Sequence, residues 1–403
     1  MNNEKIKKKI KEIREKYPNV VTIGYGPKVT GGIQTSQISF VIGVKEKKKL
    51  SELTPEEIIP SSFWIDNVEI LTDVKPVGNI QRVVCPSQCT VNSNTGSRLV
   101  QRPIKGGLQI GSDHNCFPGA CYIGTLGFIA VDYVSNCLVG VTNSHVTNTD
   151  LGGESRRYTS TWPNSQPTYN GFNKRVGQPQ SGSNYIGQLV RYVPTYSYNN
   201  KVDGALIALS GSVVDFNESY KQFGLNYDLP MEFATTSEID NLLSTHSTGG
   251  IYSSGRTTGP KGPGPCELKI SGINVDVDNV PNGFGFYNSI EYVRQNDDCV
   301  NPVSGGDSGS ALIADFGGVW KIIGLVYAGS SECYGCPFKW GIACRIDDVV
   351  NELSIYAWDG SPKSFISTVE YITVPGGSNS DMITCDGKEY WQLGMTTNNN
   401  QCV

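Results

Sequence analysis

A glycine-rich segment at residues 304–310 carries a serine that could act as a nucleophile. The segment is S-G-G-D-S-G-S, and Ser308 lies between Asp307 and Gly309. Glycines allow a tight turn in which backbone N–H groups point at one spot, and such a turn can stabilise the oxyanion of acyl transfer. A predicted strand at residues 310–314 would hold the turn on a rigid element. Alone, the same motif also fits an ordinary Gly-Ser surface loop.

A serine hydroxyl needs a base to become a nucleophile, and the chain has three histidines, His114, His145 and His246. His145 follows the apolar strand predicted at residues 138–142 after two small polar residues, and strand ends are where loops build functional sites. His114 and His246 lie in polar loops without such a strand. An isolated His145 would be interpreted as a hydrogen-bonded histidine at a strand end. Together with the turn around Ser308, it is predicted to be the general base.

The imidazole in turn needs an acid on its other nitrogen, and Asp203 is the predicted one. It heads the apolar run D-G-A-L-I-A-L at residues 203–209. The alternative is Asp215, which follows 12 residues later and therefore belongs to the far end of that strand. An orienting carboxylate must be rigid and shielded, which favours the entry to a buried strand. An aspartate at a strand start can also be a simple turn former.

The elements that would position these side chains are mostly short strands. The 403 residues include 46 Gly and 20 Tyr, which favours many turns and an all-β core in a chain long enough for two or three domains. Short apolar segments separated by turn residues predict a barrel or sandwich over residues 106–353. The predicted strands are residues 108–110, 124–131, 138–142, 186–192, 204–209, 310–314 and 320–327, with a closing helix at 346–353.

The segments outside residues 106–353 show other patterns of apolar and polar residues. Residues 1–80 follow an α-β-β-α-β order, with the second helix predicted at the capping box that begins at Thr54. These residues are expected to fold as a separate small α+β domain that adds no catalytic group. In the first helix, apolar side chains recur on one face, which is expected to pack on its own domain rather than on a membrane or partner. These are Ile6, Ile10, Ile13 and Tyr17. Residues 81–105 are predicted to be a linker, and residues 354–403 a β-rich tail.

Charge and composition exclude several classes of function. The net charge of −5 argues against nucleic acid as the main partner, and no apolar run is long enough for a membrane helix. The basic N-terminus lacks the apolar core of a secretory signal, so a cytoplasmic location with mostly free thiols is expected. The 12 cysteines favour an oxidised exterior instead, which leaves secretion open. Their close pairs are Cys85/Cys89, Cys116/Cys121 and Cys333/Cys336.

Taken together, three motifs resemble those of the chymotrypsin/trypsin-like serine peptidase superfamily. They are T-N-S-H-V at residues 142–146, D-G-A-L-I at 203–207 and G-D-S-G at 306–309, and their His, Asp, Ser order is that of chymotrypsin. Residues 254–259, S-G-R-T-T-G, are similar to a strand and turn of bacterial trypsin-like peptidases. The resemblance covers residues 106–353. The first 80 residues resemble the leader domain that precedes such peptidase domains in some bacterial proteins.

The resemblance implies an all-β fold of two orthogonal barrels with the site between them. The spacing of 58 residues from His145 to Asp203, and of 105 from Asp203 to Ser308, fits the first two in one barrel and the third in the next. The resemblance also implies an oxyanion hole made by the N–H groups of Gly306 and Ser308. The implied substrate pocket is Pro302, Tyr327, Ala328 and Gly329. No acid stands near Pro302, so a preference for Arg or Lys gains no support.

Three functions compete at this stage. The first is a serine endopeptidase that acts on protein or peptide through an acyl-enzyme and needs no metal or cofactor. The alternative is an inactive peptidase-like scaffold that binds protein. The third is a cysteine-based metal or redox protein built on Cys333 and Cys336, but no second pair has the two-residue gap that a zinc site favours. In the family a cystine flanks the serine loop, which would join Cys299 to Cys333 or Cys336.

Overall fold

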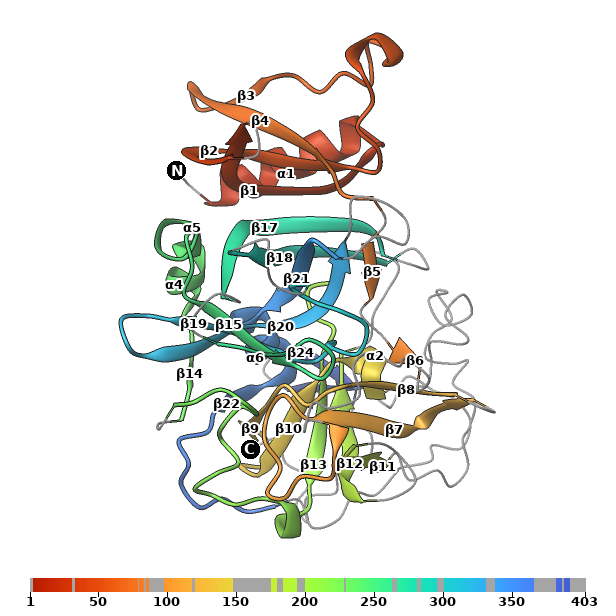
Figure 1. The fold of residues 1–403 in the computed structure, drawn as a ribbon, viewed down its shortest axis with the longest axis vertical. Helices are drawn as coiled ribbons and strands as arrows, with labels where there is room; N and C mark the ends of the chain where they lie inside the picture. The colour runs from red at the N-terminus through yellow and green to blue at the C-terminus, as the bar shows by residue number, and fades with distance from the viewer. Residues whose placement is uncertain are drawn as a thin grey trace.

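The structure is a computed structural model that describes most of the chain. The described residues are 3–30, 33–78, 80–82, 85–86, 98–117, 120–147, 175–179, 184–193, 200–227, 230–262, 267–280, 284–295, 301–330, 338–365, 382–385 and 388–391. They form three tiers in Figure 1, with the N-terminal unit at the top and two β-barrels below it.

The first barrel is a ring of antiparallel strands. Its strands are β7 (Gln109–Phe117), β8 (Ala120–Thr125), β9 (Phe128–Asp132), β10 (Leu138–Thr142), β11 (Arg175–Gly177), β12 (Tyr185–Tyr192) and β13 (Ala205–Leu209). Only Leu126 and Gly127 separate β8 from β9, so the two act as one bent strand. This bent strand pairs with β7 at one end and β10 at the other, and the path β10–β13–β12–β11–β7 closes the ring.

The second barrel closes in the same way. Its strands are β15 (Ile251–Gly255), β17 (Leu268–Val280), β18 (Phe284–Arg294), β19 (Ala311–Asp315), β20 (Trp320–Ser330) and β21 (Trp340–Arg345). The pairing runs β15–β19–β20–β21–β18–β17, and the contact of Ile251 with Leu268 returns the path to β15. The expected all-β double barrel is therefore confirmed.

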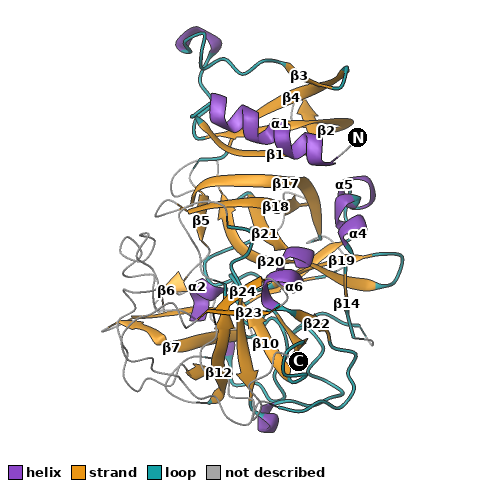
Figure 2. Ribbon diagram, turned by 180° about the vertical axis from the view of Figure 1, so that it is seen from behind, coloured by secondary structure: helices purple, strands orange, loops and turns teal. Residues whose placement is uncertain are grey.

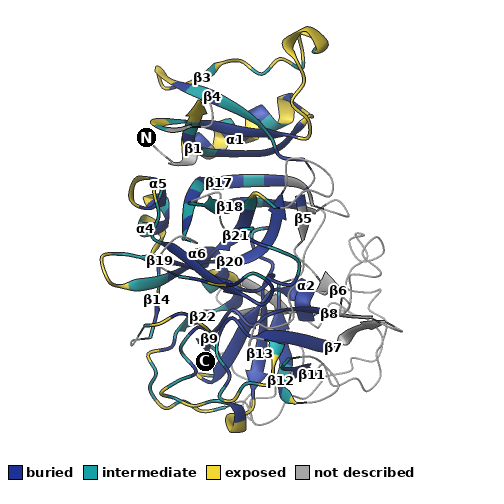
Figure 3. Cartoon of the chain, in the orientation of Figure 1, coloured by how far each residue is buried: buried dark blue, intermediate teal, exposed yellow. Residues whose placement is uncertain are grey.

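The apolar runs of the central strands are explained by burial on both faces. Every residue of β9, β10 and β13 is buried (Figure 3). Alternate residues such as Leu138 and Ile207 fill the first barrel, whereas their neighbours Val139 and Leu206 belong to the large core shared with the second barrel. A strand that faces apolar surroundings on both sides needs no polar alternation.

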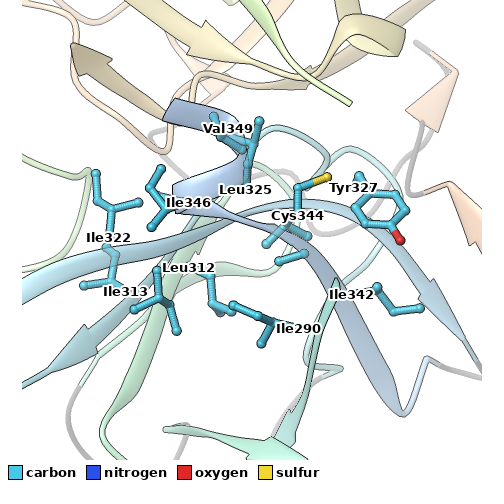
Figure 4. Close-up of a cluster of buried hydrophobic side chains, with 14 of the residues drawn as sticks. Ile290, Leu312, Ile313, Ile322, Leu325, Tyr327, Ile342, Cys344, Ile346 and Val349 are labelled. Carbon is cyan, nitrogen blue, oxygen red and sulfur yellow. The ribbon is translucent and has the colours of Figure 1, made fainter. Parts of the chain in front are cut away.

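The core of the second barrel is closed by a helix near the end of the described chain. This helix is α6 (Ile346–Leu353), and its bounds match the helix predicted from the sequence. Figure 4 shows Ile346 and Val349 of α6 in one cluster with Leu312 of β19 and Leu325 of β20.

The N-terminal unit has its own core. Its elements are α1 (Asn3–Lys16), β1 (Val20–Thr30), β2 (Ile33–Val44), the 3₁₀ turn η1 (Leu50–Glu52), β3 (Ser62–Ile65) and β4 (Val68–Pro76). The predicted apolar face of α1 is confirmed, because its four side chains are buried against sheet residues such as Ile23 and Phe40. Figure 2 shows α1 lying along the sheet of this unit. The helix predicted at Thr54 is wrong. Glu57 does accept from the Thr54 N–H at 3.0 Å, but residues 55–57 form only a single turn. Nucleating a helix is costly, and one turn adds too few hydrogen bonds to offset that cost.

The sheet of the N-terminal unit continues the second barrel. Strand β1 pairs with β17, with Ile23 opposite Asp276. Two ion pairs cross the same junction. Lys75 Nζ lies 2.6 Å from Glu291 Oε1, and Arg14 lies 3.5 Å from Asp276.

Short elements complete the described structure. They are β5 (Ile80–Arg82), β6 (Cys85–Pro86), α2 (Ser144–Thr147), η4 (Gly211–Val213), β14 (Glu232–Phe233), α4 (Thr236–Asp240), α5 (Leu242–Thr245), β16 (Gly259–Lys261), β22 (Ile355–Ala357), β23 (Met382–Cys385) and β24 (Lys388–Trp391). Both β5 and β6 belong to the stretch around the expected linker, and both pair with barrel strands. Among the described helices, none is long and apolar enough to span a membrane.

Candidate active site

The pairing of β10 with β13 brings His145 and Asp203 together. The two strands are antiparallel, and Thr142 at the end of β10 lies opposite Ala205 at the start of β13. The residues that follow β10 and those that precede β13 therefore meet at one edge of the first barrel. His145 lies in α2, just beyond this edge, and Asp203 lies two residues before β13.

The Asp203 carboxylate is fully buried and bonded through both oxygens. Its Oδ2 lies 2.5 Å from His145 Nδ1. Its Oδ1 accepts from the Ser144 hydroxyl at 2.7 Å and from the His145 backbone N–H at 3.1 Å. The Asn143 amide donates to the Asp203 backbone carbonyl at 2.6 Å. These contacts fix both the carboxylate and the imidazole in one orientation.

The turn that carries Ser308 requires glycine on each side. Gly306 has φ +97° and Gly309 φ +91°, values that residues with a Cβ rarely adopt. A Cβ at Gly309 would also lie 2.3 Å from both the Thr125 carbonyl oxygen and Thr142 Oγ1. The glycines predicted to shape this turn are thus needed for both backbone conformation and close packing.

The same packing places Ser308 beside the edge that carries His145. The Thr125 N–H donates to the Ser308 carbonyl at 2.8 Å, and a Cβ on Gly124 would approach both that carbonyl and the Val146 side chain. The Ser308 hydroxyl, itself buried, donates to the Tyr327 carbonyl at 3.4 Å, which is a long hydrogen bond. The serine turn of the second barrel therefore packs against the same edge of the first barrel that carries His145.

Some backbone N–H groups of the serine turn have no internal acceptor. Those of Ser304, Asp307, Gly309 and Ser310 donate to Asp307 Oδ2, Ser304 O, Val326 O and Asp307 O, respectively. The N–H groups of Gly305, Gly306 and Ser308 donate no hydrogen bond within the described residues. The two N–H groups predicted for the oxyanion hole are among these three.

Two threonine hydroxyls hold the peptide planes of this turn. Thr257 Oγ1 donates to the Gly305 carbonyl at 2.5 Å and accepts from the Arg256 guanidinium at 3.0 Å. Thr125 Oγ1 donates to the Gly306 carbonyl at 2.8 Å and accepts from the Arg256 backbone N–H at 3.0 Å. A hydroxyl that accepts from a donor must direct its own proton elsewhere. The Gly305 carbonyl and the Gly306 N–H belong to one trans peptide and point in opposite directions. By holding the Gly305 carbonyl, Thr257 therefore also fixes the direction of the Gly306 N–H.

Asp307 anchors the turn from behind. Its carboxylate accepts backbone N–H groups of Thr257 at 2.6 Å, Thr258 at 3.1 Å and Ser304 at 2.9 Å. Burial raises the pKa of Asp307, although these hydrogen bonds act in the opposite direction. Burial also lowers the pKa of the adjacent Arg256 to about 10. Electrostatic attraction to the Asp307 carboxylate acts against the effect of burial and raises the pKa of Arg256 and of Lys261.

The residues predicted for the substrate pocket are all buried, and three of them lie on β20. The Tyr327 side chain packs inward, with its ring 4.5 Å from Phe286 and its hydroxyl 3.0 Å from Ser289 Oγ. It is therefore the backbone of Tyr327 that reaches Ser308. Ala328 and Gly329 follow it along β20, and Pro302 lies buried before the serine turn.

The competing candidates lie elsewhere. Both ring nitrogens of His246 are engaged, by the Thr245 hydroxyl at 2.7 Å and by the Asp315 carbonyl at 2.9 Å. Asp215 accepts the N–H of Asn217 in the turn after η4. The side chain of His114 lies outside the described residues. Sequence reasoning missed the supporting roles of Ser144, Asn143, Thr125 and Thr257, although three of these lie in motifs that it quoted.

The cysteine interpretation gains nothing from the described part of the chain. Cys137 and Cys344 are buried free thiols, and the Asp203 N–H donates to Cys344 Sγ at 3.4 Å. Burial raises the pKa of the Cys344 thiol well above its usual value. No group of three or more His, Cys, Asp or Glu side chains that could hold a metal occurs among the described residues. Cys299, Cys333 and Cys336 lie outside them.

Comparisons with known proteins bear on the fold alone. No protein-family model matches the sequence, and no curated protein is similar to it at a significant level. Solved structures do match. One is a glutamic acid-specific serine protease that is 17% identical, with 63% of this chain and 100% of that one covered and a TM-score of 0.38. A Nocardiopsis protease is 17% identical, with 63% of this chain and 98% of that one covered and a TM-score of 0.38. A Cellulomonas bogoriensis chymotrypsin is 13% identical, with 64% of this chain and 98% of that one covered and a TM-score of 0.38. TM-scores of this size are too low to support an argument about activity.

Proposed function

We propose that the protein is a serine endopeptidase that hydrolyses peptide bonds through an acyl-enzyme. The observation that carries the proposal is the buried contact of 2.5 Å between Asp203 and His145, at the barrel edge against which the Ser308 turn packs. A carboxylate, an imidazole and a Gly-flanked serine in this arrangement suit nucleophilic catalysis better than metal binding or thiol chemistry.

The mechanism follows from the tautomer that Asp203 selects. A carboxylate can only accept, so it holds the proton of His145 on Nδ1 and leaves Nε2 basic. With substrate bound, the Ser308 hydroxyl leaves its long bond to Tyr327, gives its proton to Nε2 and attacks the scissile carbonyl. His145 then protonates the leaving amine, and water hydrolyses the acyl-enzyme by the reverse sequence of proton transfers.

The developing oxyanion is assigned to the N–H groups of Gly306 and Ser308. Neither N–H donates a hydrogen bond within the described residues, and Thr257 and Asp307 hold the surrounding peptide planes. Donors fixed in advance stabilise a transition state without reorganising, and losing one typically costs about 10²–10³ in kcat. Protein or peptide is the proposed substrate class. Position 302, where an acidic residue would favour a basic substrate side chain, is occupied by Pro302.

Labelling with a fluorophosphonate tests the proposal against the inactive-scaffold alternative. The wild-type protein should become labelled on Ser308 and hydrolyse casein, whereas Ser308→Ala should do neither while keeping its thermal stability. His145→Ala should lose activity by about 10⁴ or more. His246→Ala is the matched control and should retain activity, since both nitrogens of that ring serve the loop around it. A folded wild-type protein that takes no label would refute the proposal.

A further inference from the structure

The segment that carries Asp203 belongs to the first barrel but docks on the second. Residues 200–203 lead towards β13, yet Asn200 pairs with β18 of the second barrel in a parallel bridge. The Asn200 N–H and its side-chain amide both donate to the Gly285 carbonyl, at 3.1 and 2.9 Å. The Tyr287 N–H donates back to the Asn200 carbonyl at 2.9 Å. The hairpin β17–β18 therefore fixes the chain three residues before the proposed orienting acid.

The main chain of Asp203 itself is held from both barrels. Its N–H donates to the thiol sulfur of Cys344 at 3.4 Å, and Cys344 lies on β21 of the second barrel. Its carbonyl accepts from the Asn143 amide, on the side of the first barrel, at 2.6 Å. The carboxylate in turn bonds to Ser144 and His145. Both Asp203 and Cys344 are fully buried, so bulk water offers this N–H no substitute acceptor.

Cys344 also belongs to the strand pair that supports the nucleophile. It lies opposite Leu325 of β20, two residues before Tyr327, whose carbonyl accepts from the Ser308 hydroxyl. In Figure 4 the Cys344 sulfur points toward the side of the core on which Tyr327 lies. This thiol therefore connects the backbone of the orienting acid to the strand pair that contacts the serine.

We propose that Cys344 is a positioning residue for the peptidase reaction, because its sulfur holds the Asp203 backbone where the carboxylate reaches His145 Nδ1. The inference rests on the proposed peptidase function and assigns the thiol no chemical step. A group that orients an imidazole must be held closely, and a misplacement of about 1 Å can cost about 10² in rate. A neutral thiol can accept a hydrogen bond, and burial keeps it neutral by raising the pKa of Cys344 well above its usual value.

The test compares substitutions at position 344 that differ in volume and in hydrogen bonding. Cys344→Ala removes the acceptor and leaves a small space, whereas Cys344→Val removes the acceptor and fills that space. Cys344→Ser keeps an atom that can accept from the Asp203 N–H. In the alanine and valine variants we expect kcat on a peptide substrate to fall about ten- to a hundredfold, with KM unchanged. The serine variant should stay within about threefold of the wild type.

Cys137 provides the matched control. It is also a buried free thiol, and its sulfur donates to the Ser135 carbonyl at 3.4 Å. Because that bond serves the turn between β9 and β10, Cys137→Ala should keep the kcat and KM of the wild type.

A second readout follows the contact between the acid and the histidine directly. It is the proton resonance of His145 Nδ1–H, observed by NMR after ¹⁵N labelling of histidine. The bond of this proton to the Asp203 carboxylate is short and charge-assisted, which shifts its resonance far downfield. The resonance should stay in place in Cys344→Ser and Cys137→Ala. It should move upfield, or broaden through exchange with water, in Cys344→Ala and Cys344→Val.

The outcomes separate positioning from stability and from the proposed function. A variant that is merely less stable would keep the wild-type resonance in its folded fraction. Wild-type kcat and an unmoved resonance in Cys344→Ala and Cys344→Val would overturn the inference and leave the peptidase standing. Equal losses in Cys344→Ser and Cys344→Val would also overturn it, because the acceptor would then make no difference. A wild-type protein that takes no fluorophosphonate, but whose resonance moves in the alanine and valine variants, would overturn the peptidase and keep the role of Cys344 in placing Asp203.

Discussion

Replacing Asp203 by asparagine should abolish activity without removing the side chain that positions the histidine. Asn has one oxygen and one NH₂ where Asp has two oxygens. Placing the oxygen at Oδ1 preserves the bonds from the Ser144 hydroxyl and the His145 N–H. The opposite placement loses both and sets NH₂ against two donors. At about 1 kcal/mol for each bond, the first placement is favoured by ~2 kcal/mol or more.

In that favoured placement the NH₂ group faces His145 Nδ1. The imidazole must then accept at Nδ1, so its proton moves to Nε2, where it can no longer take the Ser308 proton. A triad held in this wrong tautomer loses about 10⁴ in kcat. The expected result for Asp203→Asn is a loss of that order in peptide hydrolysis near neutral pH, with an unchanged fold.

The assay is kcat/KM on a peptide substrate, combined with near-ultraviolet circular dichroism to confirm folding. Asp215→Asn makes the same chemical change in the turn after η4 and should leave kcat/KM unchanged. Activity of Asp203→Asn within tenfold of the wild type would refute the tautomer argument. A collapse of Asp215→Asn instead would show that the wrong acid has been assigned.

Three further predictions follow from other contacts. Thr257→Val should lower kcat about ten- to a hundredfold with little change in KM. The Gly306 N–H loses its fixed orientation, and this N–H is proposed to bond to the oxyanion in the transition state rather than to the bound substrate. Thr257→Ser should restore kcat, and Ser254→Ala, which removes a hydroxyl bonded to the Phe223 carbonyl, should not lower it. Cys344 should resist iodoacetamide at pH 8 in the folded protein and react after unfolding, as peptide mapping would show, because only the thiolate is reactive and burial raises its pKa. Lys75→Met should lower the free energy of unfolding by ~2 kcal/mol, since it leaves the Glu291 carboxylate, 4% exposed, without its ion-pair partner. Adding Glu291→Gln to that variant should recover part of the loss in thermal denaturation.

The strands that carry the site were predictable because they are buried on both faces. The bounds expected for β10 are those observed, and β13 begins one residue later than expected. Continuous apolar runs of this kind stand out without knowledge of the partner strand. The long hairpin β17–β18 was not predicted, because polar residues interrupt its sequence. Its pairing shifts register at four places, so no steady period of two marks it.

The candidate site was predictable as residue types but not as a supporting network. A histidine after one strand and an aspartate before another indicate a meeting point only once the two strands are known to be antiparallel neighbours. The hydroxyls of Ser144, Thr125 and Thr257 carry no signal of their own, because threonine and serine also occur at ordinary turns. Their roles depend on carbonyl and carboxylate groups up to 181 residues away in the chain, as for Thr125 and Gly306.

The pairing of β1 with β17 also sets the order of events during synthesis. Ile23 and its partner Asp276 are 253 residues apart, so β1 leaves the ribosome long before β17 exists. At about 5–20 residues per second, this delay is roughly 13–50 s. Throughout it, one edge of β1 is covered by β2 while the other has no partner, and an unpaired edge is a template for association with other chains. During this interval the nascent N-terminal unit therefore carries an unpaired sheet edge that could associate with other chains.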